Sequence, residues 1–200
     1  MRALVVDFGG VLTTSIWTAF AAFCEGEGLA PEAVRELFRD DPEALALLRR
    51  LETGELAAEE FEPRFGARLG VERTEGLIES LFAGLRPDEA MIGAVRTARD
   101  HGVLTGLISN SWGLGIYDRA PTDLFDATVI SGEVGLHKPQ PEIFTLACER
   151  LGVEPAEVVF VDDLRENCAG AEAVGMTAIL HRDSADTITK LEGLLGLDLR

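Results

Sequence analysis

The chain contains few of the residues that would point to a disulfide framework or a membrane anchor. Its three cysteines, Cys24, Cys148 and Cys168, are odd in number and far apart, which favours buried core thiols over disulfides or a zinc site. No apolar run approaches the roughly 20 residues of a membrane span. Met1 and Arg2 lead directly into a short apolar run without a signal-peptide pattern. We therefore expect a cytoplasmic protein with no membrane partner.

Positive charge is also scarce. The chain has 18 Lys and Arg residues against 35 Asp and Glu residues, and its formal net charge is -17 at pH 7. Duplex nucleic acids and anionic membranes attract clustered Lys and Arg, so no nucleic-acid partner is expected. A small anionic substrate still fits the chain if positive charge is concentrated locally. The composition does not indicate the oligomeric state.

The chain does contain a regular alternation of short β-branched runs with longer amphipathic patterns. Its 200 residues, 46% of them hydrophobic, allow one sizeable core or a core with a smaller companion. The runs typical of strands are residues 3–6, 104–109, 127–130, 158–161 and 177–180. The patterns typical of helices around them are residues 87–100, 141–151, 167–174 and 185–195. This alternation predicts an α/β protein with a doubly wound, Rossmann-like parallel sheet.

One long stretch interrupts the alternation. Residues 13–85 contain no convincing strand and instead show five amphipathic patterns, at residues 17–27, 31–38, 42–51, 58–69 and 74–82. Because this insertion leaves the sheet directly after the first strand, it should lie over the carboxyl ends of the strands, where open α/β sheets bind ligands. We predict a core domain of residues 1–12 and 86–200 and an all-helical cap of residues 13–85. A bundle with no part in the site is the alternative.

Carboxylates stand where two of the predicted strands end. Asp7 follows the apolar run at residues 3–6, and Asp162 and Asp163 follow the run at residues 158–161. An ionised carboxylate in such apolar surroundings persists only beside a cation or strong hydrogen-bond donors. The two strand ends therefore predict one shared metal site.

Groups that suit a phosphate follow other predicted strands. Ser109 and Asn110 end the second strand, at the sheet edge that carries Asp7. Lys138 lies in a proline-containing loop before a helix, and it is one of only two lysines, since the other 16 of the 18 basic residues are arginine. A compact ammonium suits a crowded position between a carboxylate and a phosphoryl oxygen better than a planar guanidinium does. A solvated loop lysine is the alternative.

These segments, in this order, resemble the motifs of the haloacid dehalogenase-like hydrolase superfamily. The matching segments are Asp7-Phe8-Gly9-Gly10-Val11 for the nucleophile motif, Ser109-Asn110 for the second, Lys138-Pro139 for the third, and Asp162-Asp163 with Asn167 for the acidic fourth. The resemblance covers the whole chain, including the helical insertion. Residues 51–55 with Phe61, and residues 161–167, resemble the branch that contains bacterial glucose-1-phosphate phosphatases and the phosphatase domain of soluble epoxide hydrolases.

The resemblance implies a phosphatase that acts on a small phosphorylated metabolite. Asp7 would attack phosphorus and form an aspartyl-phosphate, which water would then hydrolyse. Lys138 would hold this nucleophile and neutralise charge. Ser109 and the backbone N–H of Asn110 would bind phosphoryl oxygens as charge develops.

The resemblance also implies a magnesium ion as cofactor. The ligands would be the Asp7 side chain, the Gly9 carbonyl and Asp163, with Asp162 in support, and these hard oxygen ligands suit Mg²⁺. Asn167 would orient the acidic loop.

One position departs from the family pattern. Most phosphatases of the superfamily carry a second Asp two residues after the nucleophile, where it protonates the leaving oxygen and then activates water, but this chain has Gly9. General acid–base help is typically worth about 10² to 10⁴ in rate. Either the leaving group departs without much help, as from a sugar 1-phosphate or an acyl phosphate, or the cap supplies a substitute. Thr13, Thr14 and Glu52 are candidates for the substitute by position, and we favour the first explanation.

Three other functions fit the same pattern less well. A haloacid dehalogenase has no use for a metal, whereas the paired Asp162 and Asp163 indicate one. A catalytically weakened phosphate-binding regulatory protein would explain Gly9 but would leave Asp7, Ser109 and Lys138 without a chemical role. A phosphomutase would need the missing second carboxylate.

Overall fold

The computed structural model describes residues 1–113, 117 and 122–200. Its five strands form one parallel sheet in the order β3-β2-β1-β4-β5. The strands are β1 (Ala3–Val6), β2 (Leu104–Ser109), β3 (Ala127–Ile130), β4 (Val158–Asp162) and β5 (Thr177–Leu180). The predicted ranges are confirmed, except that β4 extends one residue further. Its last residue is Asp162, which pairs with Leu180 and whose carbonyl accepts the N–H of His181 at 2.8 Å.

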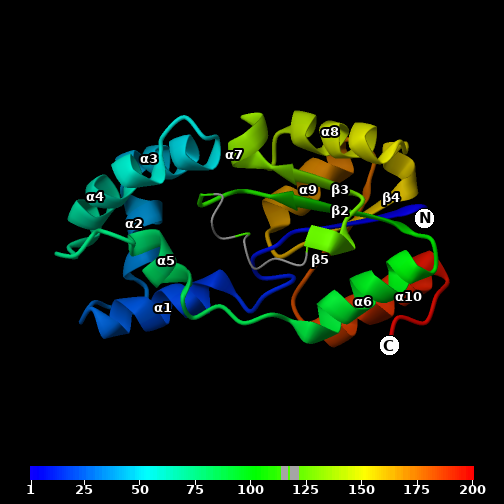
Figure 1. The fold of residues 1–200 in the computed structure, drawn as a ribbon, viewed down its shortest axis with the longest axis horizontal. Helices are drawn as coiled ribbons and strands as arrows, with labels where there is room; N and C mark the ends of the chain where they lie inside the picture. Colours follow the sequence, from blue (N-terminus) through cyan, green and yellow to red (C-terminus); the bar gives the residue numbers. More distant parts are fainter. Residues whose placement is uncertain (114–116, 118–121) are drawn as a thin grey trace.

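Helices cover both faces of the sheet, as the alternating pattern predicts (Figure 1). On one face, α6 (Glu89–Asp100) and α10 (Ser184–Leu195) pack with Leu4 and Val6 of the central strand. On the other, α8 (Pro141–Leu151) and α9 (Arg165–Ala173) pack with Ala3 and Val5. Successive side chains of a strand point to opposite faces, so a strand that is buried on both sides has a continuous apolar sequence. The doubly wound α/β core is therefore confirmed.

Some helices begin at other residues than predicted. Helix α6 begins at Glu89 and not at Pro87, because Pro87 forms an isolated antiparallel bridge with Thr13 and the Asp88 side chain accepts the N–H of Met91 as an N-cap. Helix α9 begins at Arg165, two residues before the predicted start at residue 167. The start of α6 thus depends on the bridge between Pro87 and Thr13, a contact between residues distant in sequence that an apolar pattern does not report.

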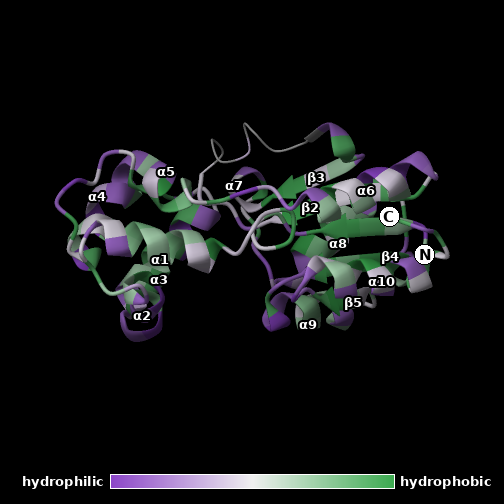
Figure 2. Cartoon of the chain, turned by 90° about the horizontal axis from the view of Figure 1, so that it is seen from below, coloured by the Kyte–Doolittle hydropathy of each residue, from purple (hydrophilic) through white to green (hydrophobic). Residues whose placement is uncertain are grey.

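The insertion between β1 and α6 is helical, as predicted. It consists of α1 (Ile16–Gly26), α2 (Ala33–Asp40), α3 (Pro42–Glu52), α4 (Ala58–Leu69) and α5 (Leu77–Phe82). These helices enclose a hydrophobic cluster of their own and form a lobe beside the sheet (Figures 1 and 2). In Figure 2 the hydrophobic strands lie between helices whose outer faces are largely hydrophilic.

Among the links between the lobes, two lie at the connecting segments and at Trp112. The first is the pair of connecting segments, where the N–H of Thr14 donates to the carbonyl of Arg86 at 2.8 Å and the N–H of Arg86 donates to Thr14 Oγ1 at 3.2 Å. The second is Trp112, which follows β2 yet packs among cap aromatics, with ring centroids 5.2 Å from Phe20 and 5.5 Å from Phe82. Trp112 is buried, so its aromatic ring packs in the interior.

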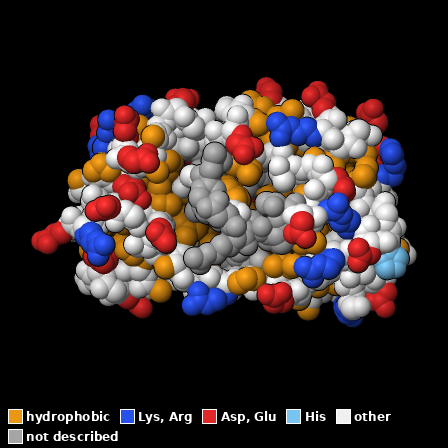
Figure 3. All heavy atoms as spheres, viewed as in Figure 1, with side chains coloured by type: hydrophobic (Ala, Val, Ile, Leu, Met, Phe, Trp, Pro, Cys, Tyr) orange, Lys and Arg blue, Asp and Glu red, His pale blue; other side chains and the backbone are white. Residues whose placement is uncertain are grey.

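The remaining composition-based expectations concern thiols, membranes and charge. All three cysteines are buried and free, which confirms the prediction of core thiols. Within the described part of the chain, no helix is both long enough and apolar enough to cross a bilayer. On the face drawn in Figure 3, acidic and basic side chains are interspersed, and the described residues there show no basic patch of the kind that binds nucleic acid.

Candidate active site

The residues expected at the site come from neighbouring strands at one edge of the sheet. Val6 of β1 pairs with Leu107 of β2 and with Val161 of β4, and the N–H of Asp7 donates to the carbonyl of Val161 at 2.9 Å. This register brings the end of β1 beside the ends of β2 and β4. In a doubly wound sheet, that carboxyl edge is where ligands bind.

Lys138 lies between two of the carboxylates. Its Nζ is 2.8 Å from Asp7 Oδ1 and 2.6 Å from Asp162 Oδ2, and it donates to the carbonyl of Ile108 at 3.0 Å. An ammonium has three protons to donate, and these three acceptors use all of them. Burial lowers the pKa of Lys138, but the charges of Asp162 and Asp7 outweigh burial and raise that pKa above its usual range. The lysine is therefore a permanent cation within a site from which solvent is nearly excluded.

Asp162 is occupied by protein donors on both oxygens. Besides Lys138, it accepts the N–H of Leu164 at 2.9 Å, and Asn167 Nδ2 lies 3.0 and 3.1 Å from its two oxygens. The Asp162 side chain is completely buried. Asn167 thus contacts Asp162 directly. The next residue, Asp163, is less buried than Asp162, because its side chain is only half-buried.

Asp7, Asp162 and Asp163 form a compact acidic cluster. One carboxylate oxygen from each residue lies within 4.8 Å of the others. Burial raises the pKa of Asp7 to about 7, the charges of Asp162 and Asp163 add to that shift, and Lys138 opposes it. Burial, with the charge of Asp162, raises the pKa of Asp163 to about 6. Three clustered carboxyl groups offer more acidic oxygens than Lys138 contacts, so a hard divalent cation such as Mg²⁺ fits this donor set.

Two glycines shape the turn after Asp7. Gly10 has a φ of 80°, and a Cβ there would come within 2.7 Å of Asp163 Oδ2, so this close approach requires glycine. A Cβ at Gly9 would come within 2.9 Å of Cγ2 of Ile16, the first residue of α1. The position that carries Asp in most phosphatases of the superfamily is therefore closed here by a side chain of the cap.

Ser109 and Asn110 lie at the same edge, but they make different contacts. Ser109 is buried, and Tyr117 donates its hydroxyl hydrogen to Ser109 Oγ at 2.7 Å. The Asn110 side chain binds the backbone of Lys138, because its Oδ1 accepts the Lys138 N–H at 2.8 Å and its Nδ2 donates to the Lys138 carbonyl at 3.1 Å. The side-chain amide is thus not a free phosphate donor, and the phosphate contact of the Asn110 backbone N–H stays a prediction.

Tyr117 is a site residue that the motifs do not reveal. It is buried, its ring lies 5.2 Å from that of Phe8, and burial raises the pKa of its hydroxyl. Tyr117 is the only tyrosine in the chain, and that rarity is the single signal in the sequence that could have drawn attention to it.

The helical insertion contributes Glu52, the last residue of α3, to the surroundings of this site. Burial raises the pKa of Glu52 to about 7, while the positive charges of Lys138 and Arg49 lower it and the negative charge of Asp7 raises it. The backbone carbonyl of Glu52 accepts a hydrogen bond from Ser131 Oγ. The C-terminal end of α3 therefore docks on the core directly after β3.

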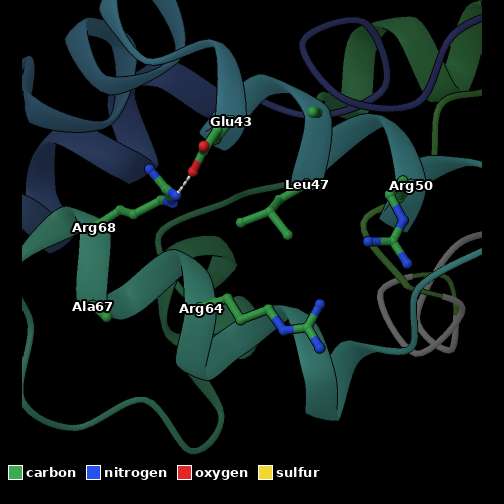
Figure 4. Close-up of a pocket in the computed structure, with 7 residues that line it drawn as sticks. Glu43, Leu47, Arg50, Arg64, Ala67 and Arg68 are labelled. Atoms are coloured by element: carbon green, nitrogen blue, oxygen red, sulfur yellow. Dashed lines mark hydrogen bonds and ion pairs between the residues drawn. The ribbon is translucent and has the colours of Figure 1, made fainter.

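A cavity of about 540 Å³ lies elsewhere, between α3 and α4 of the cap (Figure 4). Arg50 of α3 and Arg64 of α4 are among the residues that line it, and Arg68 pairs with Glu43 and with Asp41. None of the residues of the acidic cluster lines this cavity. The site described above is therefore defined by converging side chains and not by this cavity.

The sequence matches a known protein family. The family model for haloacid dehalogenase-like hydrolases matches residues 1–175. The chain belongs to this family. The resemblance inferred from the motifs is thus confirmed.

The curated relatives differ in how much of their own length this chain covers. D-ribitol-5-phosphate phosphatase of Bacteroides thetaiotaomicron is 27% identical over 212 residues, which cover 98% of each chain. Bifunctional epoxide hydrolase 2 of Sus scrofa is 27% identical over 220 residues, covering 100% of this chain, and acyl-CoA dehydrogenase family member 10 of Mus musculus is 28% identical over 208 residues, covering 99%. The chain spans 40% and 19% of the lengths of these two longer relatives.

Solved structures agree with the fold. An enzyme of the family from Bacteroides thetaiotaomicron, solved in complex with magnesium and inorganic phosphate, superposes with a TM-score of 0.69 at 21% identity, covering 91% of this chain and 94% of that one. A predicted hydrolase of the family from Porphyromonas gingivalis gives a TM-score of 0.75 at 24% identity, covering 96% and 97%. At these identities the likeness establishes the shared fold.

Proposed function

We propose that this hydrolase is a magnesium-dependent phosphatase of a small phosphorylated metabolite, such as a sugar 1-phosphate or a similar phosphomonoester. The reaction would pass through an aspartyl-phosphate on Asp7. The observation that carries the proposal is the environment of Asp7, a buried carboxylate at the ligand-binding edge, held by Lys138 and clustered with Asp163. The D-ribitol-5-phosphate phosphatase that matches nearly the whole chain supports the same reaction class.

The side chains suit an attack on phosphorus. Lys138 holds Oδ1 of Asp7, which leaves Oδ2 to form the bond to phosphorus while the bond from phosphorus to the leaving oxygen breaks. Ser109 Oγ already accepts a hydrogen bond from Tyr117, so its own hydroxyl hydrogen is available to a phosphoryl oxygen. The buried ammonium of Lys138 offsets the negative charge that accumulates when a carboxylate meets a phosphate.

The acidic cluster would hold the metal. Asp7, Asp163 and the carbonyl of Gly9 are the proposed ligands, with Asp162 in support, because both Asp162 oxygens already accept hydrogen bonds from the protein. When bound, magnesium supplies positive charge that polarises the phosphoryl oxygens and reduces the repulsion between two anions. Asn167 fixes Asp162 and thereby the loop that carries Asp163.

We also propose that residues 13–85 act as a cap over this site, with residues 1–12 and 86–200 as the core domain. The docking of α3 on Ser131 and the influence of Lys138 and Asp7 on Glu52 support this arrangement. A cytoplasmic location and the absence of a nucleic-acid partner stay predictions from composition.

The proposal is tested with a panel of phosphorylated metabolites. We expect the purified protein to release phosphate from at least one of them with Mg²⁺ and to stop when EDTA is added. Asp7→Asn, which keeps the shape of the side chain, should abolish that release. Equal release by wild type and Asp7→Asn would identify a contaminating phosphatase and contradict the proposal, as would chloride release from 2-chloropropionate without metal.

A further inference from the structure

We propose that Glu52 transfers the proton that Gly9 cannot, first as general acid toward the leaving oxygen and then as general base toward water. The inference rests on the proposed phosphatase function and deepens it, because it assigns a catalytic residue from the cap. It also replaces the explanation that the substrate must have a leaving group that departs without help.

Position 9 itself is closed to an acidic side chain. A Cβ at Gly9 would lie 2.9 Å from Cγ2 of Ile16, and a β-branched side chain in a helix is confined largely to one rotamer. An aspartate at this position would therefore collide with the start of α1 before its carboxyl reached a substrate. Any proton-transfer group must come from another part of the chain.

The two threonines at the start of the cap are already engaged. Thr13 Oγ1 donates to the carbonyl of Thr14 at 2.9 Å and accepts the N–H of Gly10 at 3.2 Å. Thr14 Oγ1 accepts the N–H of Arg86 at 3.2 Å. These hydroxyls bind the connecting segments between the lobes, and a threonine hydroxyl does not titrate near neutral pH. Of the three candidates suggested by position, Glu52 is the one that is left.

The backbone of Glu52 is fixed against the catalytic core. Ser131, at the start of α7 (Ser131–Val134), donates its hydroxyl hydrogen to the carbonyl of Glu52 and accepts the N–H of Ser111 at 2.8 Å. Gly54 approaches the same helix, because a Cβ there would lie 2.6 Å from the carbonyl oxygen of Gly132. Since Ser111 lies two residues after Ser109, this chain of contacts ties the end of α3 to the proposed phosphate-binding loop. These contacts fix the backbone from which the Glu52 side chain extends, as a site built on a rigid element requires.

The electrostatic surroundings of Glu52 suit a group that alternates between acid and base. The charges that act on its carboxyl are Lys138, Arg49 and Asp7, and burial is the largest effect, so the pKa of Glu52 rises to about 7. Glu133, on the helix against which α3 docks, is exposed. A catalytic pKa near the working pH gives the best compromise between the fraction in the correct protonation state and the driving force for transfer.

The two half-reactions balance with Glu52 in this role. In the first, Asp7 Oδ2 forms a bond to phosphorus, the bond from phosphorus to the substrate oxygen breaks, and protonated Glu52 gives its proton to that oxygen. In the second, the Glu52 carboxylate takes a proton from water while the water oxygen bonds to phosphorus and the bond to Asp7 breaks. Phosphate leaves, and Asp7 is restored as a carboxylate and Glu52 as an acid. The substrate class then includes alkyl phosphomonoesters such as hexose 6-phosphates.

The test compares Glu52→Gln with a matched control, Glu55→Gln, which removes an exposed carboxylate three residues away. We expect Glu52→Gln to lower kcat for a hexose 6-phosphate by about 10² to 10⁴ and to lower it far less for p-nitrophenyl phosphate, whose leaving group needs no proton. Glu52→Asp should recover part of the lost activity. The pH profile of Glu52→Gln should also lose the ionisation near neutrality that wild type shows.

Three outcomes separate this inference from the function on which it rests. Equal activity of Glu52→Gln and Glu55→Gln on both substrates would overturn the role of Glu52 while the phosphatase function stands. An equal loss on both substrates, with an unchanged pH profile, would also overturn it, because a purely structural defect does not distinguish leaving groups. The absence of Asp7-dependent phosphate release from wild type would overturn the proposed function and this inference with it.

Discussion

Replacement of Lys138 by methionine should destabilise the protein strongly, because it leaves a buried carboxylate without its cation. The ammonium contacts Asp162 at 2.6 Å and Asp7 at 2.8 Å, and Asp162 is completely buried. Removing one partner of a buried ion pair typically costs about 3–5 kcal/mol. For a protein of this size, 1 kcal/mol shifts Tm by about 2–4 °C, so the expected loss is about 6–20 °C.

The other lysine of the chain provides the control. Lys190 pairs with Asp186 at 2.6 Å one helical turn away, and both side chains are about half exposed, at 50% and 49%. A surface pair of this kind contributes roughly 0.3–0.5 kcal/mol, so Lys190→Met should shift Tm by no more than about 2 °C. Both variants would be melted in EDTA at neutral pH and followed by circular dichroism.

A double variant isolates the ion pair. Lys138→Met with Asp162→Asn should be more stable than Lys138→Met alone, because the second change removes the buried charge left behind. Equal melting temperatures for Lys138→Met and Lys190→Met would refute the argument that Lys138 is the buried counter-ion of the site.

Two further predictions concern the carboxylates. Asp163→Ala should raise the magnesium concentration needed for activity more than Asp162→Ala does, because Asp162 is occupied by Lys138, Leu164 and Asn167; the reverse order in a magnesium titration would show that the ligands are wrongly assigned. The folded-state pKa of Asp7, about 7, lies above its ordinary value of 3.8. Between these two pH values the folded metal-free protein binds more protons than the unfolded chain does. The free energy of unfolding therefore falls as pH rises from 3.8 to about 7. Asp7→Asn should therefore raise Tm in EDTA above neutral pH and flatten its decline between acidic and neutral pH, and a lower Tm than wild type would contradict this reasoning.

The strands of this protein can be read from its sequence nearly to the residue. A parallel strand that is covered by helices on both faces has a nearly continuous apolar sequence, as Leu4 to Val6 and Val158 to Val161 do. The position of Asp7, Ser109 and Asp162 at one edge follows from the same logic, because parallel strands end on the same side. The sequence predicts this meeting of residues without any knowledge of loop structure.

Contacts made by loops, and contacts between the two lobes, are harder to predict from the sequence. Two such contacts are the hydrogen bond from Tyr117 to Ser109 and the hydrogen bonds of the Asn110 side chain to the backbone of Lys138. They depend on the path of the loops, which the pattern of apolar residues does not predict. The same holds for the cap, where the sequence leaves Thr13, Thr14 and Glu52 as equal candidates. Only the hydrogen bonds of the threonine hydroxyls and the charges around Glu52 distinguish them.

The central claim is that Asp7 becomes covalently phosphorylated during turnover. The most direct measurement is acid quenching of the enzyme at steady state with its substrate and Mg²⁺, followed by digestion and mass spectrometry of the peptide that contains residue 7. We predict a phosphoryl group on Asp7 in wild type and none in Asp7→Asn. Turnover without any adduct on that peptide, or with an adduct on another residue, would contradict the account.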